Sequence, residues 1–121
     1  MAFTVANPDT PKIVHSWPVV VQTAVDGGKV RKDEIMVDYR VLLQDEIDDV
    51  LQAARESGEN EQCALLRNSV VSIAGRVDET GQPIPFNEES LSDALNRVNE
   101  RMAMMSSFYD VHNGRKAVRK N

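Results

Sequence analysis

The sequence predicts an α+β fold in which an N-terminal antiparallel β-hairpin packs on three to four α-helices, with the C-terminal helix the longest. Two patterns lead to this prediction. Apolar residues alternate at every second position over residues 35–43, and from residue 45 onward they recur at three- and four-residue spacing. The 121 residues are enough for one domain. We therefore expect an extended N-terminal arm at residues 1–16, a single α+β domain at residues 17–112 and a basic C-terminal tail at residues 113–121.

The predicted hairpin follows a proline-containing arm, because Pro8 and Pro11 disfavour helix and sheet. Residues 18–25 are rich in β-branched side chains, and the glycines at residues 26–29 permit a tight reversal of the chain. The returning strand places one set of apolar residues on a single face: Ile35, Val37, Tyr39, Val41 and Leu43. Charged residues 32–34 interrupt this alternation, which predicts a bulge or a wider, solvent-exposed end of the hairpin.

Two helices are predicted between the hairpin and the last part of the chain. The first is amphipathic, begins near Asp45 and ends at Ser57 and Gly58. Its first turn is rich in carboxylates, which suit the positive end of a helix dipole and, with no histidine beside them, do not predict a metal or acid–base site. The second helix is expected over residues 60–75, where apolar residues form one stripe.

A rigid strap is predicted over residues 77–86, where Gly81 permits a turn and two prolines hold the chain extended. Ile84 and Phe86 are expected to point inward from this strap. Asn87 is the expected N-cap of the last helix.

The last helix carries two neighbouring apolar lines. The first is a heptad-like seam formed by Leu91, Leu95, Val98, Met102, Met105 and Tyr109. The second contains Ala94, Met104, Phe108 and Val111. A break near Glu100 and an unbroken helix to Val111 both fit the sequence, because no Gly or Pro decides between them.

Two apolar lines on one helix exceed what a core of this size needs, so we expect part of this surface to bind a partner or a second copy of the chain. The candidate protein-binding residues are Met102, Met104, Met105, Phe108 and Val111. The methionines are flexible enough to adapt to several partner shapes. Core filling is the alternative explanation for each of these residues.

Composition argues against several classes of protein. The chain is 41% hydrophobic and 27% charged, as in ordinary globular domains. It has no apolar stretch long enough to cross a bilayer and no secretory signal, so we expect no membrane partner and a cytoplasmic location. Cys63 has no second cysteine to pair with and is interpreted as a small buried apolar residue, while His15 and His112 form no metal motif. No metal and no cofactor are expected.

Charge and motifs favour protein binding over other functions. The net charge is −5, and only the tail at residues 113–121 is strongly basic, so nucleic-acid binding is not expected, although a small nucleic-acid-binding regulator is kept as an alternative. The sequence contains no phosphate-binding loop and no recognisable set of nucleophile, base and orienting acid. His112 lies near the end of the last helix, where a protonated imidazole would suit the dipole. We do not expect an enzyme.

Three segments together resemble the tail assembly chaperones of long-tailed bacteriophages and their prophages. They are the strand and turn of residues 17–29, residues 77–89 followed at once by a helix opening on Leu91, and the basic ending of residues 119–121. The resemblance covers most of the chain from Trp17 onward. Members often carry a Trp just after the glycine equivalent to Gly75, whereas this chain has Arg76 there.

This resemblance implies a non-catalytic chaperone that acts in the cytoplasm of the bacterial host and is absent from the mature virion. Such a chaperone binds the tape measure protein and promotes polymerisation of the tail tube, so the implied partners are the tape measure protein and the tail tube protein. We also expect a homo-oligomer. The alternative function is another phage morphogenesis component, a connector or tail completion protein that stays in the particle.

Overall fold

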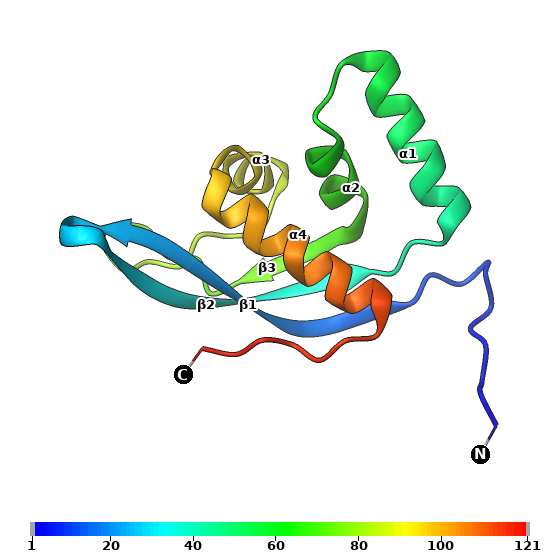
Figure 1. Cartoon of the computed structure of the whole chain (residues 1–121), viewed down its shortest axis with the longest axis horizontal. Helices are drawn as coiled ribbons and strands as arrows, with labels where there is room; N and C mark the ends of the chain where they lie inside the picture. Colours follow the sequence, from blue (N-terminus) through cyan, green and yellow to red (C-terminus); the bar gives the residue numbers. More distant parts are fainter. Residues whose placement is uncertain (1, 121) are drawn as a thin grey trace.

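The computed structural model describes residues 2–120 and has the predicted α+β architecture (Figure 1). Three antiparallel strands form one sheet in the order β1-β2-β3, and four α-helices pack with it. The strands are β1 (Ile13–Val25), β2 (Lys29–Arg40) and β3 (Val70–Ala74). The helices are α1 (Gln44–Ser57), α2 (Glu61–Ser69), α3 (Glu88–Asn96) and α4 (Val98–Asn113), of which α4 is the longest with 16 residues.

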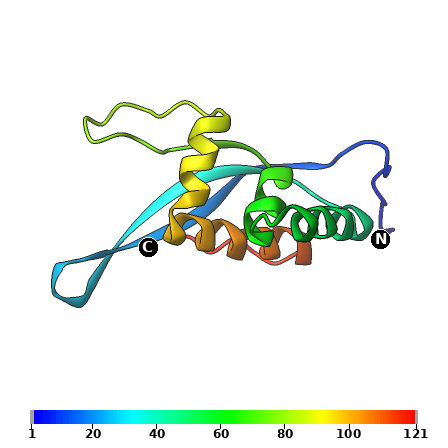
Figure 2. The same ribbon diagram turned by 90° about the horizontal axis from the view of Figure 1, so that it is seen from above.

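The hairpin of β1 and β2 is confirmed, with Val19 opposite Ile35 and a short 3-10 turn at Asp26–Gly28. Gly27 and Gly28 have φ of 80° and 77°, which side chains other than hydrogen disfavour, so the paired glycines permit this turn. The pairing is regular across residues 32–34, so no bulge lies there. The other predicted alternative, a solvent-exposed end of the hairpin, is confirmed, because this end is exposed and projects beyond the helices (Figure 2).

β1 begins at Ile13, inside the predicted arm of residues 1–16. Ile13 lies opposite Arg40, and the N–H of Val41 donates to the Lys12 carbonyl at 2.8 Å. The register shifts between Val14 and Trp17, where Ser16 has a φ of 52° and its N–H donates to Asp38 Oδ1 at 2.7 Å. The extended arm is therefore shorter than expected, because this irregular stretch still pairs with β2.

The helix predicted over residues 60–75 is wrong in its second half. α2 ends at Ser69, and the next five residues form β3, with Ile73 opposite Val37. Val70 and Ile73 fit a helical stripe as well as a strand, so spacing alone does not decide between the two. The β-branched residues of this short segment favour a strand once β2 offers a free edge.

The core lies between one face of the sheet and the helices α2, α3 and α4. Its most deeply buried side chains are Val19, Val37, Tyr39, Leu66, Leu95, Met104 and Phe108. The Tyr39 hydroxyl donates to the Met104 carbonyl at 2.9 Å and so joins β2 to α4. Burial of the phenol raises the pKa of Tyr39. After Arg40 the chain leaves the sheet, and Leu42 is buried in place of the expected Leu43.

The connections follow the predicted local chemistry. α1 ends at Ser57, with Gly58 in the left-handed conformation. Asn87 caps α3 through its side chain, which accepts the Ser90 N–H at 2.8 Å. In the strap, Val77 bridges to Pro83, and Phe86 packs partly buried against the core.

Candidate protein-binding site

The last helix of the sequence prediction is two helices, α3 and α4, joined at Arg97. This residue has φ −91° and ψ 113°, which are not helical values, and α3 and α4 run in clearly different directions (Figure 2). The chain therefore breaks three residues before Glu100, without Gly or Pro. Because the helix axis changes there, the expected seam from Leu91 to Tyr109 does not continue along one face.

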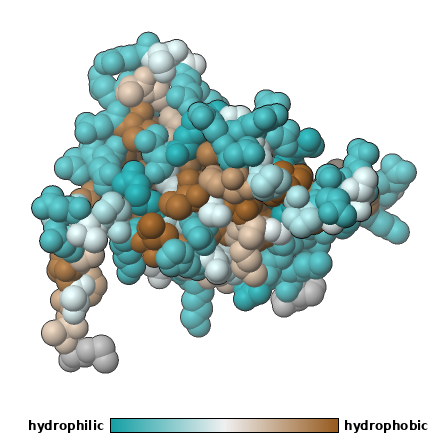
Figure 3. All heavy atoms as spheres, turned by 180° about the vertical axis from the view of Figure 1, so that it is seen from behind, coloured by the Kyte–Doolittle hydropathy of each residue, from teal (hydrophilic) through white to brown (hydrophobic). Residues whose placement is uncertain are grey.

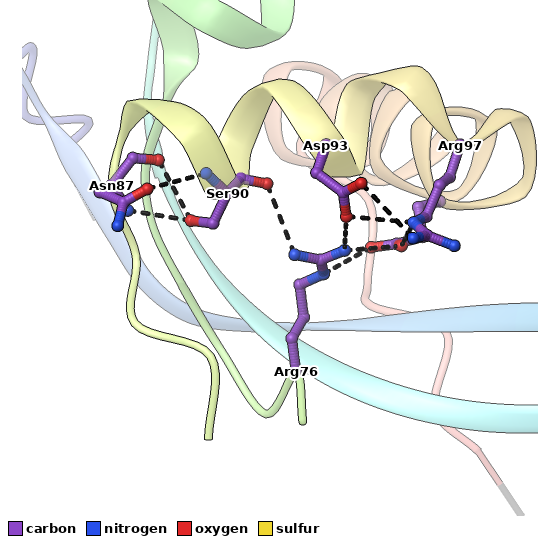
Figure 4. Close-up of polar contacts among 6 residues, drawn as sticks. Arg76, Asn87, Ser90, Asp93 and Arg97 are labelled. Carbon is purple, nitrogen blue, oxygen red and sulfur yellow. Dashed lines mark hydrogen bonds and ion pairs between the residues drawn. The ribbon is translucent and has the colours of Figure 1, made fainter. Parts of the chain in front are cut away.

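Arg76, which lies between β3 and the strap of residues 77–86, fixes this corner (Figure 4). Its guanidinium donates twice to Glu100, with Nε to Oε2 at 2.8 Å and Nη2 to Oε1 at 3.0 Å. Nη2 also donates to Asp93 at 2.9 Å, and Nη1 donates to the Ser90 carbonyl at 3.4 Å. The Arg76 side chain thus connects the segment after β3 to both α3 and α4, and it helps to hold α4 in its orientation relative to α3.

The charges at this corner stabilise each other. Burial would lower the pKa of Arg76, but its hydrogen bonds to Glu100 and Asp93 outweigh burial and raise it. Hydrogen bonds from Arg97 and then Arg76 lower the pKa of Asp93. Only 11% of the Arg76 side chain and 13% of the Glu100 side chain are exposed. The corner is therefore a largely buried ion pair and has a structural role.

The structure separates the five residues predicted to bind protein. Met104, Met105 and Phe108 are 0%, 2% and 2% exposed and belong to the core of the monomer. Val111 is partly buried against the same core, and only Met102 is exposed, at 50%. The prediction is therefore corrected for Met104, Met105 and Phe108, because core filling, the alternative explanation, accounts for all three: Met104 and Phe108 of the second apolar line and Met105 of the first are buried in the monomer.

A groove runs between the outer face of α4, the hairpin and the C-terminal tail, which folds back beside α4 (Figure 1). Met102 and Ala103 of α4, Val20 of β1 and Val118 of the tail supply its apolar lining, and the open volume is about 450 Å³. Polar residues of the same groove are Gln22, Lys32, Asn99, Ser106, Asp110 and Arg119. Asn99 donates to the Gln22 carbonyl at 3.0 Å, which closes this part of the β1 edge. The groove offers a partly apolar surface with charged residues in its lining.

The tail is held at this groove by charged side chains. Arg119 donates to both carboxylate oxygens of Glu34, with Nη2 to Oε1 at 2.7 Å and Nε to Oε2 at 3.2 Å. The Lys120 N–H adds a bond to Oε2 at 3.1 Å. These bonds, from Arg119 first and then Lys120, hold the pKa of Glu34 below its usual value. The basic tail thus neutralises an acidic residue of the hairpin.

The opposite face of the molecule differs in character (Figure 3). Seen from behind, apolar atoms gather in the middle of the molecule, whereas the projecting end of the hairpin is mainly hydrophilic. We place the candidate site at the groove, because it combines a hollow, an exposed Met102 and a seated segment of chain.

His112 has a different role from the one expected. Its Nδ1 lies 2.7 Å from the Phe108 carbonyl, and the Leu42 N–H donates to its Nε2 at 2.9 Å. These partners fit a neutral imidazole that carries its proton on Nδ1. Burial lowers the pKa of His112, so it acts as an uncharged link between α4 and the residues after β2.

The remaining candidates for chemistry lie apart. Cys63 is half-buried in the first turn of α2, where its N–H donates to the Asn60 side chain at 3.0 Å. His15 is exposed beside Asp38, at 3.3 Å. Within residues 2–120, no three His, Cys, Asp or Glu side chains gather as a metal site. None of the helices in the same part of the chain is long and apolar enough to cross a membrane.

Comparison of the chain with protein-family models, with curated proteins and with solved structures gave no match. The description of the site therefore depends on the geometry above.

Sequence reasoning did not find Val20, Glu34, Asp110 and Val118 as members of one site. Val20 was visible as one of the β-branched residues of the predicted strand at 18–25, and the basic tail was visible as a cluster of charge. Their meeting depends on the tail folding back after Gly114, which no local pattern indicates.

Proposed function

We propose that this protein is a non-catalytic tail assembly chaperone of a long-tailed bacteriophage or prophage. It binds the tape measure protein and promotes polymerisation of the tail tube. The observation that best supports a binding role is the groove beside α4. This groove has an open volume of about 450 Å³, and Met102 is half-exposed in its wall. The identity of the client comes from the resemblance of residues 17–29 and 77–89 to such chaperones.

Binding at this groove suits an elongated apolar client. Met102 is unbranched and polarizable, so it adapts to different side chains of a partner. The groove is open and lies beside the rigid corner fixed by Arg76, so α4 presents it without rearrangement of the core. The net charge of −5 favours solubility of the chaperone with its client.

Co-expression with the tape measure protein of the same phage or prophage tests the proposal. We expect the client to remain soluble and to co-purify with the chaperone, and the tail tube protein to join the complex. Met102→Glu should weaken this capture. Val98→Glu is the matched control, because Val98 is an exposed apolar residue of the same helix but does not line the groove.

Two results would contradict the proposal. One is a client that stays insoluble and does not co-purify with the wild-type chain. The other is detection of the protein by mass spectrometry as a stoichiometric component of purified virions, which would favour a connector or tail completion protein.

A further inference from the structure

Asp110 lines the groove, Glu34 binds Arg119 of the groove lining, and the chain's own tail places an arginine at each of these two carboxylates. Glu34 meets Arg119 at 2.7 Å, and Asp110 meets Arg115 at 4.0 Å. Each of the two acidic side chains is only 16% exposed, whereas the arginines are 60% and 67% exposed. The two carboxylates are therefore largely buried in the folded domain, whereas the arginines of the tail contact them from the solvent side.

One segment of the tail reaches both carboxylates. Arg115 and Arg119 are four residues apart, and residues 115–120 have no helical or strand structure. At this spacing Arg115 lies 4.0 Å from Asp110 and Arg119 lies 2.7 Å from Glu34.

The tail is attached mainly through side chains. Beyond the helix cap formed by the Arg115 N–H and the Asp110 carbonyl, the Lys120 N–H donates to a side chain, Glu34. Within the described residues, no backbone hydrogen bond joins residues 116–120 to β1 or α4. Because the arginine side chains of these pairs are 60% and 67% exposed, water can replace the partners that the arginines lose when the tail leaves.

The apolar part of the tail fits the groove poorly. Val118 remains 68% exposed and Met102 50% exposed, while about 450 Å³ stays open between them. The tail therefore satisfies the charges of the groove and leaves its apolar wall largely uncovered. A segment with the same arginines and a larger apolar side chain would cover this wall better.

We propose that the groove is a docking site for an extended segment of a partner protein that carries two arginines four residues apart and a large apolar residue just before the second. The chain's own residues 115–120 lie across this site in the free protein and are displaced when the partner binds, so that Val20, Met102 and Ala103 are the apolar wall that the partner covers. This inference goes beyond the proposed function, because it names the chemistry of the bound segment whichever protein carries it.

A fluorescently labelled peptide with the sequence of residues 114–120, but with Phe in place of Val at position 118, tests the site. Its binding is measured by fluorescence anisotropy against the full chain and against a chain carrying Arg115→Ala and Arg119→Ala. If the tail is docked in nine-tenths or more of the molecules, releasing it raises the apparent affinity at least about tenfold. The unaltered Val peptide should bind the released chain less tightly than the Phe peptide.

Charge variants then locate the binding. Glu34→Gln combined with Asp110→Asn should abolish peptide binding, whereas Asp48→Asn on α1 is the matched control and should leave it unchanged. Circular dichroism of each variant shows whether it is folded. Peptide binding that is unchanged by release of the tail, or by loss of Glu34 and Asp110, would overturn the inference.

Two further outcomes would also overturn it. If the wild-type chain dimerises in sedimentation experiments and Arg115→Ala with Arg119→Ala makes it monomeric, the natural occupant of the groove is the tail of a second copy. If neither peptide binds while the tape measure protein still co-purifies with the wild-type chain, the docking site is wrong and the proposed function stands. If the peptide binds and the client does not, the proposed function fails and the docking site stands.

Discussion

Replacing Phe108 by alanine tests which side of α4 faces the core. The Phe108 ring is 2% exposed, stacks on His112 with ring centroids 3.9 Å apart and meets Tyr109 edge-on at 5.8 Å. Alanine removes the whole ring and leaves a cavity that the rigid sheet behind α4 fills poorly. Substitutions of this kind in protein cores cost about 3–5 kcal/mol. We expect Phe108→Ala to lose a free energy of unfolding in this range.

Met102→Ala is the matched substitution on the other side of the same helix. Because Met102 is half-exposed and borders an open groove, we expect its removal to cost less than about 1 kcal/mol. Urea unfolding followed by circular dichroism measures both variants. With an m-value of about 2 kcal/mol/M, the midpoint of Phe108→Ala should fall by about 1.5–2.5 M, and that of Met102→Ala by less than about 0.5 M.

The comparison would refute the reasoning if the two variants lost equal stability, or if Met102→Ala were the less stable one. Either result would mean that α4 is rotated relative to the sheet. Phe108 would then be free to contact a partner, as the sequence alone suggested.

Two other predictions concern polar links that hold α4 in place. Arg76→Met leaves the largely buried Glu100 carboxylate without its main partner, so we expect the free energy of unfolding, measured by thermal unfolding, to fall by about 3 kcal/mol. Arg97→Ala should lower it by less than about 1 kcal/mol, because the Arg97 side chain is 60% exposed. Equal losses would contradict a structural role for Arg76. Because burial lowers the pKa of His112 below 6.5, the unfolded chain takes up its proton first as the pH falls, so this contribution is complete above about pH 6.5 and is lost below it. His112→Gln should remove this part of the pH dependence between pH 7 and 5, and an unchanged profile would show that His112 is not the responsible group.

The hairpin, the end of α1 and the start of α3 could be predicted from local chemistry. Paired glycines determine the turn between β1 and β2, Gly58 ends α1, and Asn87 caps α3. In each case one or two adjacent residues carry the information, and the surrounding fold changes little. Alternation in β2 predicted the buried face correctly for Ile35, Val37 and Tyr39.

β3 and the break at Arg97 could not be predicted in the same way. Both depend on partners distant in sequence: the free edge of β2 turns residues 70–74 into a strand, and Arg76 fixes the corner between α3 and α4. A helical pattern of apolar residues continues through residues 70–74 and through Arg97. Periodicity alone therefore predicted a helix where β3 forms, and it did not decide whether the last helix breaks.

The candidate site was predictable only in part for a related reason. Met102 was named from its place on an apolar line, but its neighbours in the groove come from β1, β2 and the tail. Local spacing does not indicate which of two apolar lines faces the sheet. It does not indicate that the tail returns to Glu34 either.

Chemical-shift mapping of the isotope-labelled full chain with its tape measure client tests the central claim most directly. We expect the amide signals of Val20, Met102 and Val118 to shift together as the client is added, and Arg119 to be released from Glu34. Signals of the Phe108 region should change little. Shifts confined to the hairpin end or to α1, with the groove unaffected, would contradict binding through this surface.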